Sequence, residues 1–102
     1  MTTATKTRTL KLMADYDCYP LWERSEAGTN NVNPLDLLIS RSLQDALNAW
    51  ALRYDDTLDR DDPRQSGFHN PIAEAAFKAD GEALLKRLQA ELGQSYRLTL
   101  RA

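Results

Sequence analysis

Apolar and polar residues alternate near both ends of the chain, and this pattern constrains the fold most strongly. In the segment that starts at Arg8, one face carries Leu10, Leu12, Ala14 and Tyr16. Near the other end, one face carries Tyr96, Leu98 and Leu100. Alternation with a period of two predicts a half-buried strand in each segment. Because a two-stranded ribbon is not stable alone, the residues between the strands must supply helices that cover the apolar face.

The first helix is predicted from about Ser42 to Leu58. Its apolar residues recur at spacings of three and four: Leu43, Ala46, Leu47, Trp50, Ala51, Tyr54 and Leu58. This spacing places them on a single helical stripe. Ser40 and Ser42 are start signals, because a serine hydroxyl can accept a hydrogen bond from a free backbone N–H of the first turn.

The second helix has clearer boundaries. Asn70 is a typical N-cap residue, Pro71 suits the first helical position, and Gly93 can close the helix in the left-handed conformation. The expected buried stripe is Ala73, Phe77, Gly81, Leu84, Leu88 and Leu92. A mid-helix glycine costs about 1 kcal/mol relative to alanine. We therefore expect a bulky side chain such as Trp50 to pack closely against Gly81.

The connections contain the residues that break regular structure. The segment from Asp17 to Arg41 is rich in Pro, Gly and Asn. A structureless loop of that length is uncommon in a small domain, so we expect a short strand at Tyr19–Trp22 and a helical turn at Pro34–Leu38. The segment from Arg60 to His69 is the predicted loop between the helices.

The predicted fold class is α+β: a small sheet that includes the N- and C-terminal strands, packed on one face by a two-helix antiparallel hairpin. Residues 1–7 are expected to form a flexible N-terminal tail, and residues 8–102 a single α+β domain. If the helices form an antiparallel hairpin and the segment between the first strand and the first helix does not cross over, the terminal strands pair antiparallel.

Composition narrows the classes of function. The net charge is −2, which lacks the positive excess that binding to phosphates requires, so we expect no nucleic-acid partner. No run of apolar residues approaches the length of a membrane span or a signal core, and we expect a cytoplasmic protein with no membrane partner. Cys18 is the only cysteine, so there is neither an internal disulfide nor a thiol zinc site. The aspartates after Asp55 do not match a calcium loop, and we expect no metal and no cofactor.

Acidic residues concentrate in the middle of the sequence. Residues 15–62 contain eleven acids and four arginines, a net charge of −7, so the remainder carries +5. Five acids lie around the end of the first helix: Asp55, Asp56, Asp59, Asp61 and Asp62. Carboxylates are disfavoured at a helix C-terminus, which favours an acidic patch that attracts a basic protein partner. A merely solvated helix end is the alternative.

The segment around Cys18 is rich in aromatic residues. Tyr16, Tyr19 and Trp22 lie among acids and a proline. Tyrosine and tryptophan are favoured at protein interfaces, so Tyr19 and Trp22 are candidate anchors for a partner. Tyr16 and Trp22 could instead complete the core of this small domain.

Two other classes of function remain open at this point. A small structural or adaptor subunit of a larger assembly would expose surplus apolar residues such as Leu38 and Leu85 in one patch. An enzyme would need Cys18 and His69 to converge in one pocket, with a strongly perturbed pKa of the thiol. No oxyanion motif or glycine-rich turn accompanies that pair.

Several segments together resemble a family of small bacterial proteins. They are DYDCYPLW at 15–22, the turn at Asn33-Pro34, WA with YDDTL within 50–58, DP with SGF within 62–68, and AEAAF at 73–77. The pattern is similar to the immunity proteins of contact-dependent growth inhibition and related polymorphic toxin systems. The likeness covers about residues 10–92.

This resemblance implies that the protein is not an enzyme but a toxin inhibitor, which binds a cognate toxin domain stoichiometrically as a monomer or weak dimer. Many such toxins are nucleases with basic clefts, so an acidic inhibitor surface would imitate their substrate. The residues expected to bind the partner are Asp55, Asp56, Asp59, Asp61, Asp62, Tyr19 and Trp22.

Overall fold

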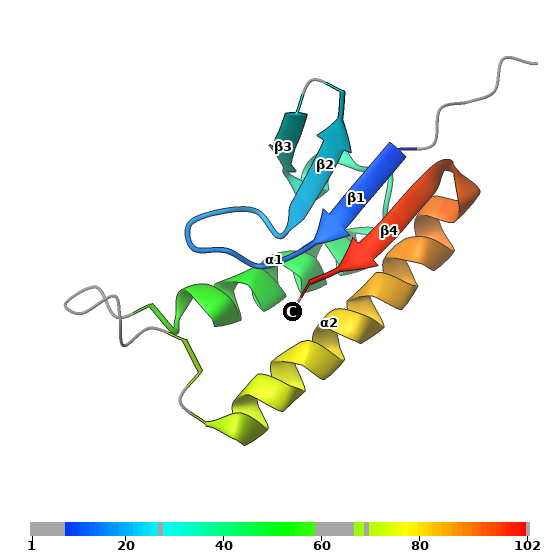
Figure 1. The fold of residues 1–102 in the computed structure, drawn as a ribbon. Helices are drawn as coiled ribbons and strands as arrows, with labels where there is room; N and C mark the ends of the chain where they lie inside the picture. The colour runs from blue at the N-terminus through cyan, green and yellow to red at the C-terminus, as the bar shows by residue number, and fades with distance from the viewer. Residues whose placement is uncertain (1–7, 27, 59–66, 69, 102) are drawn as a thin grey trace, which may run out of the picture.

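The computed structural model describes residues 8–26, 28–58, 67–68 and 70–101 (Figure 1). A four-stranded sheet that includes both terminal strands packs with two α-helices, which confirms the α+β class. Several predictions fall on residues outside the described ones: the tail at residues 1–7, most of the loop at 60–69, the role of His69, and partner binding by Asp59, Asp61 and Asp62.

The sheet has the strand order β3-β2-β1-β4. Its strands are β1 (Arg8–Leu12), β2 (Leu21–Ser25), β3 (Gly28–Val32) and β4 (Tyr96–Leu100). Neighbours β1 and β2 pair antiparallel, as do β2 and β3. The short strand expected at Tyr19–Trp22 begins two residues later and extends to Ser25. Strand β3 was not predicted, because its sequence GTNNV has no apolar alternation and its first four residues are exposed.

The terminal strands β1 and β4 pair parallel, not antiparallel, because the segment between the first strand and the first helix does not meet the condition set for antiparallel pairing. Strands β3 and β1 end at the same end of the sheet, because Val32 pairs with Leu21 of the intervening strand β2, and Leu21 pairs with Leu12. The next helix begins at the opposite end of the sheet, where the Ser40 N–H donates to the Glu91 carboxylate shortly before β4 starts. The connecting segment therefore crosses the length of the sheet (Figure 1), and this crossing reverses the direction of β4.

The two helices are α1 (Arg41–Asp55) and α2 (Pro71–Leu92), with short 3-10 turns η1 (Pro34–Asp36) and η3 (Gly93–Ser95). The predicted N-cap of α2 is confirmed, because the Asn70 side chain accepts from the Ile72 N–H. Gly93 is the C-cap with a positive φ of +71°, but its ψ of −156° differs from the predicted left-handed helical conformation. Helix α1 begins after Ser40, as expected, but ends before Leu58. It stops early because the hydroxyl and the N–H of Thr57 both donate to the Tyr54 carbonyl and close the last turn.

The core lies between the helices and one face of the sheet. Its most buried members are Leu10, Leu12, Leu21, Leu37, Leu43, Leu47, Trp50, Phe77, Leu84 and Leu88. The Trp50 ring stacks on Phe77 with centroids 4.4 Å apart, and its indole N–H donates to the Phe77 carbonyl. A Cβ atom on Gly81 would lie 2.9 Å from Cζ2 of Trp50, which confirms the predicted close approach. Residues on the other face of the sheet point away from the helices.

Neither described helix has a stretch long and apolar enough to cross a membrane.

Candidate functional site

A groove runs along the surface between the loop that joins β1 to β2, the turn η1 and helix α1. We call it the Tyr19 groove. It encloses about 660 Å³ and is lined by Asp17, Cys18, Tyr19, Asn33, Leu35, Asn48, Ala51, Leu52 and Asp55. Two residues predicted to contact a partner, Tyr19 and Asp55, therefore lie together in one depression.

Hydrogen bonds fix the loop that carries Tyr19. The Asp17 N–H donates to Oδ1 of Asp55 at 3.0 Å, which ties the loop to the end of α1. The Asn31 side chain accepts from the Tyr19 N–H and donates to the carbonyls of Tyr19 and Leu21. Because the N–H and the carbonyl of Tyr19 are both hydrogen-bonded, its backbone is fixed, and the position from which its ring projects is defined.

The walls of the groove expose large apolar side chains. Tyr19 is 45% exposed, Leu35 54% and Leu52 60%. Leu38, close along the chain, is 97% exposed. Apolar and aromatic side chains that lie together on a surface mark a site for protein contact.

Leu35, Asn48 and Leu52 line the groove but were not predicted to contact a partner. The spacing of residues along α1 could have indicated Asn48 and Leu52. Asn48, Leu52 and Asp55 are spaced by four and three, so they form a second helical stripe beside the buried one. The exposure of Leu35 depends on how η1 crosses the sheet, which no local pattern specifies.

Two carboxylates, Asp17 and Asp55, line the groove beside Cys18. Burial raises the pKa of the Cys18 thiol, and the charges of Asp15, Asp17 and Asp55 raise it further. A nucleophilic cysteine requires the opposite shift, so the environment of Cys18 does not support the alternative of an enzyme that uses Cys18 with His69. Neither Asp55 nor Asp56 forms an ion pair with any described Lys or Arg.

The other predicted contact residues lie elsewhere. Asp56 is exposed at the C-cap of α1, adjacent to the groove. Trp22 is half-buried on the open face of the sheet, where its indole N–H donates to the Met13 carbonyl. The structure thus brings Tyr19 together with Asp55 and Asp56, and separates them from Trp22.

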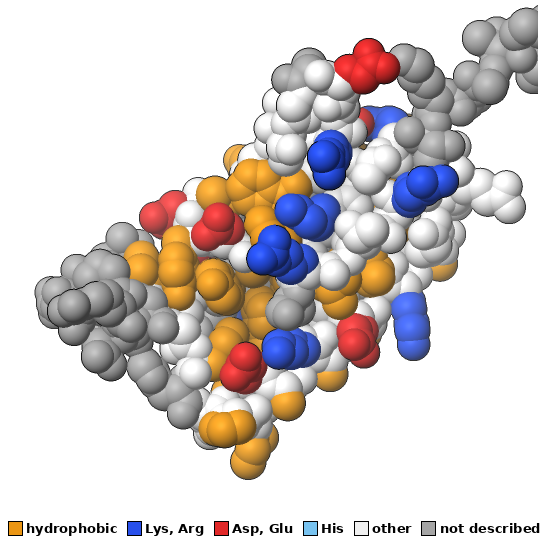
Figure 2. All heavy atoms as spheres, viewed as in Figure 1, with side chains coloured by type: hydrophobic (Ala, Val, Ile, Leu, Met, Phe, Trp, Pro, Cys, Tyr) orange, Lys and Arg blue, Asp and Glu red, His pale blue; other side chains and the backbone are white. Residues whose placement is uncertain are grey.

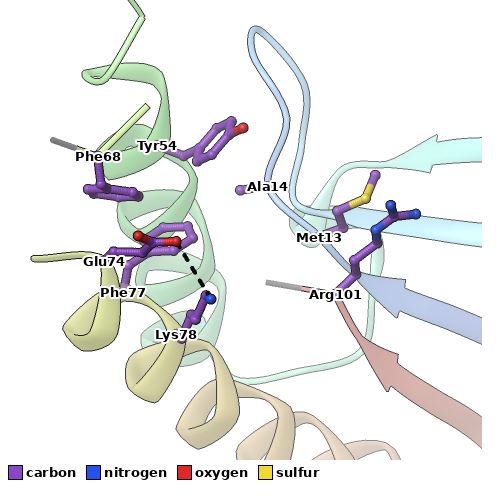
Figure 3. Close-up of a pocket in the computed structure, with 8 residues that line it drawn as sticks. All are labelled: Met13, Ala14, Tyr54, Phe68, Glu74, Phe77, Lys78 and Arg101. Carbon is purple, nitrogen blue, oxygen red and sulfur yellow. Dashed lines mark ion pairs between the residues drawn. The ribbon is translucent and has the colours of Figure 1, made fainter. Parts of the chain in front are cut away.

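A second hollow of about 250 Å³ opens on the other side of the loop (Figure 3). Tyr54, Phe68 and Phe77 form one wall, and Met13 and Arg101 lie across from them. The cavity has an aromatic lining and an ion pair of 3.6 Å between Glu74 and Lys78 at its edge.

Tyr16 belongs to the aromatic cluster behind this hollow. Its ring stacks on Tyr54 with centroids 4.6 Å apart, and its hydroxyl bonds with that of Thr57 at 3.1 Å. Burial, followed by the hydrogen bond with Tyr16, raises the pKa of Tyr54. Tyr16 therefore packs on Tyr54, which lies against the core, but Tyr16 is not itself a member of the core.

Other chemistries find little support within the described part of the chain. No group of three or more His, Cys, Asp or Glu residues there could hold a metal ion. The adaptor hypothesis required Leu38 and Leu85 in one exposed patch. Leu85 instead packs against the core, while Leu38 is exposed.

The family model described as Serratia CdiI immunity protein-like matches residues 8–101. This range contains every helix and strand of the fold, from β1 to β4. No curated protein matches the chain.

Proposed function

The chain belongs to the Serratia CdiI immunity protein-like family, and from this membership we propose that it binds a cognate toxin domain and thereby neutralises it. The complex is stoichiometric, and the Tyr19 groove with its acidic border is the contact surface. The toxin is a nuclease whose basic cleft receives this surface. The family match carries the proposal, and the composition of the groove supports its details.

Charge supports a basic partner. Asp15, Asp17, Asp55 and Asp56 lie at or beside the groove, and the last two have no basic partner among the described residues. Unpaired carboxylates create a field that attracts a positively charged surface and accelerates association. A cleft that binds phosphates offers such a surface, so binding there would block access of the nucleic acid.

Shape supports a protein partner. Tyr19, Leu35 and Leu52 offer apolar area that water covers in the free protein. In protein complexes, most of the affinity usually comes from burial of such residues at the centre of the interface, where a polar rim surrounds them. Tyr19 is the expected anchor, because hydrogen bonds already hold its backbone.

The test is binding of the purified toxin domain encoded next to this chain, measured by isothermal titration calorimetry at low and physiological salt. We expect a one-to-one complex, loss of toxicity, and weaker binding at higher salt. Tyr19→Ala should weaken binding by about thirtyfold, or about 2 kcal/mol, as expected for an anchor. Asp55→Asn keeps the acceptor for the Asp17 N–H and should weaken binding three- to fivefold, by about 1 kcal/mol.

Matched controls come from α2, away from the groove. Glu82→Gln removes one exposed charge, as Asp55→Asn does, and Ile72→Ala shortens an exposed apolar side chain. Both should bind the toxin like the unmodified protein. Absence of any complex would refute the proposed function. A complex insensitive to salt and to Asp55→Asn would refute only the acidic surface.

A further inference from the structure

The open face of the sheet is basic. Pairing of the strands assigns eight outward positions to it: Thr9, Lys11, Trp22, Arg24, Thr29, Asn31, Arg97 and Thr99. Three of them are Lys or Arg, and none is acidic. Figure 2 shows several basic side chains over the strands, whereas the acidic side chains in that view lie around them, over the neighbouring loops and the region of α2.

These cations are not neutralised locally. None of them forms an ion pair with another described residue. Glu23 is the only acid within the four strands, and it lies on the helix-facing side, where Arg8 donates to both of its carboxylate oxygens. Part of the positive excess outside residues 15–62 is therefore displayed on one surface.

The open face of the sheet also contains a hollow. A shallow hollow of about 220 Å³ lies between Lys11, Trp22 and Arg24, with three threonines completing its wall. The hydrogen bond from the indole of Trp22 to the Met13 carbonyl, 2.9 Å long, holds the ring in place. Because the strands are hydrogen-bonded to one another, these side chains project from a rigid platform.

We propose that this open face binds an acidic surface of the same toxin domain whose basic cleft faces the Tyr19 groove. This inference rests on the proposed function and adds a second contact of opposite sign. The two surfaces meet at Asn31, an outward residue of β3 whose side chain bonds the backbone of Tyr19. One partner can therefore span both surfaces without a gap between them.

An acidic protein surface fits this face better than nucleic acid does. The whole chain carries a net charge of −2, so its long-range field opposes the approach of an extended polyanion. Binding of single strands also requires several aromatic rings on which bases stack. Trp22 is the only aromatic residue among the outward strand positions.

Two adjoining surfaces of opposite charge would fix the orientation of the toxin. A toxin with the wrong charge distribution would meet repulsion at one surface or at both. Trp22 then has the anchoring role expected from the sequence, but in the basic contact rather than in the acidic one.

The test reverses charge on the open face. In the combined variant Lys11→Glu and Arg97→Glu, toxin affinity should fall by about tenfold, mainly through slower association. The control combines Lys86→Glu with Arg87→Glu on exposed positions of α2, which changes the net charge equally. It should bind within about twofold of the unmodified protein. Thermal unfolding verifies that each variant folds, and Lys11→Gln with Arg97→Gln replaces the first pair if it does not.

The outcomes separate the two proposals. If the unmodified protein does not bind the toxin, the proposed function is wrong and the inference falls with it. If the unmodified protein binds but reversal at Lys11 and Arg97 has no more effect than the control, only the basic contact is wrong. A fluorescent single-stranded RNA of mixed sequence is titrated in parallel. Binding of this RNA that depends on Lys11 and Arg97, with toxin binding unchanged, would overturn the inference in favour of a nucleic-acid surface.

Discussion

Replacing Gly81 by alanine adds one methyl group at the closest approach of α2 to the core. The new Cβ atom would lie 2.9 Å from Cζ2 and 3.3 Å from Cε2 of Trp50, distances that real Cβ atoms rarely or never show. The indole cannot easily move, because it stacks on Phe77 and its N–H bonds the Phe77 carbonyl. Relief of the clash must therefore shift α2 relative to α1.

Two effects of opposite sign determine how much Gly81→Ala changes the free energy of unfolding. Alanine in place of a mid-helix glycine stabilises a helix by about 1 kcal/mol. Overpacking of a close-packed core costs about 1–3 kcal/mol. We expect Gly81→Ala to lower the free energy of unfolding by about 1 kcal/mol, which corresponds to a fall of about 5 °C in Tm for a domain of this size.

The assay is urea unfolding followed by circular dichroism and tryptophan fluorescence. Ala79→Gly, at an exposed position of the same helix, calibrates the helix propensity and should cost about 1 kcal/mol. In a Trp50→Phe background the clash should be smaller, so Gly81→Ala should become less harmful. Stabilisation by Gly81→Ala in the otherwise unmodified protein would refute the close packing of Gly81 against Trp50.

Two further predictions concern titration. The guanidinium of Arg8 holds the pKa of Glu23 below its usual range. The ion pair therefore stabilises the fold at pH values above the pKa of the unfolded state, about 4.3. This stabilisation is lost as the pH falls through the lower pKa of the folded state. Glu23→Gln should therefore lower the free energy of unfolding at pH 7 by at most about 1 kcal/mol. The difference between the variant and the unmodified protein should vanish in acid, and an equal difference at both pH values would contradict this assignment. Because burial and nearby carboxylates raise the pKa of Cys18, iodoacetamide should react several-fold more slowly at pH 8 with the folded protein than with the chain in urea. Faster reaction of the folded protein would instead support a nucleophilic thiol.

Local signals predicted the helices well. Asn70, Pro71 and Gly93 mark the ends of α2 because capping depends on a few neighbouring backbone groups. The close approach at Gly81 was also predictable, since glycine in mid-helix is costly unless another group occupies the space. The end of α1 was missed because Thr57, a single hydroxyl residue, closes the helix before the apolar stripe ends.

Long-range arrangement was less predictable. The pairing of β1 with β4 depends on the route of residues 33–40 across the sheet, and no alternation or capping signal encodes that route. Within the site, charge and aromatic content identified Tyr19 and Asp55, which the fold brings together. Trp22 was grouped with them because it is close in sequence, but successive residues of a strand point to opposite faces, and β2 directs Trp22 to the open one.

The parallel pairing of β1 with β4 has a consequence for the rate of folding. Residues that face each other there, such as Arg8 and Tyr96, are separated by 88 positions along the chain. Before such distant positions can form stabilising contacts, the chain must pay the entropic cost of closing a very large loop. Proteins rich in such contacts therefore fold slowly. Hairpin β2–β3 and the two helices can form early from local contacts, whereas one side of β1 stays unpaired until β4 arrives.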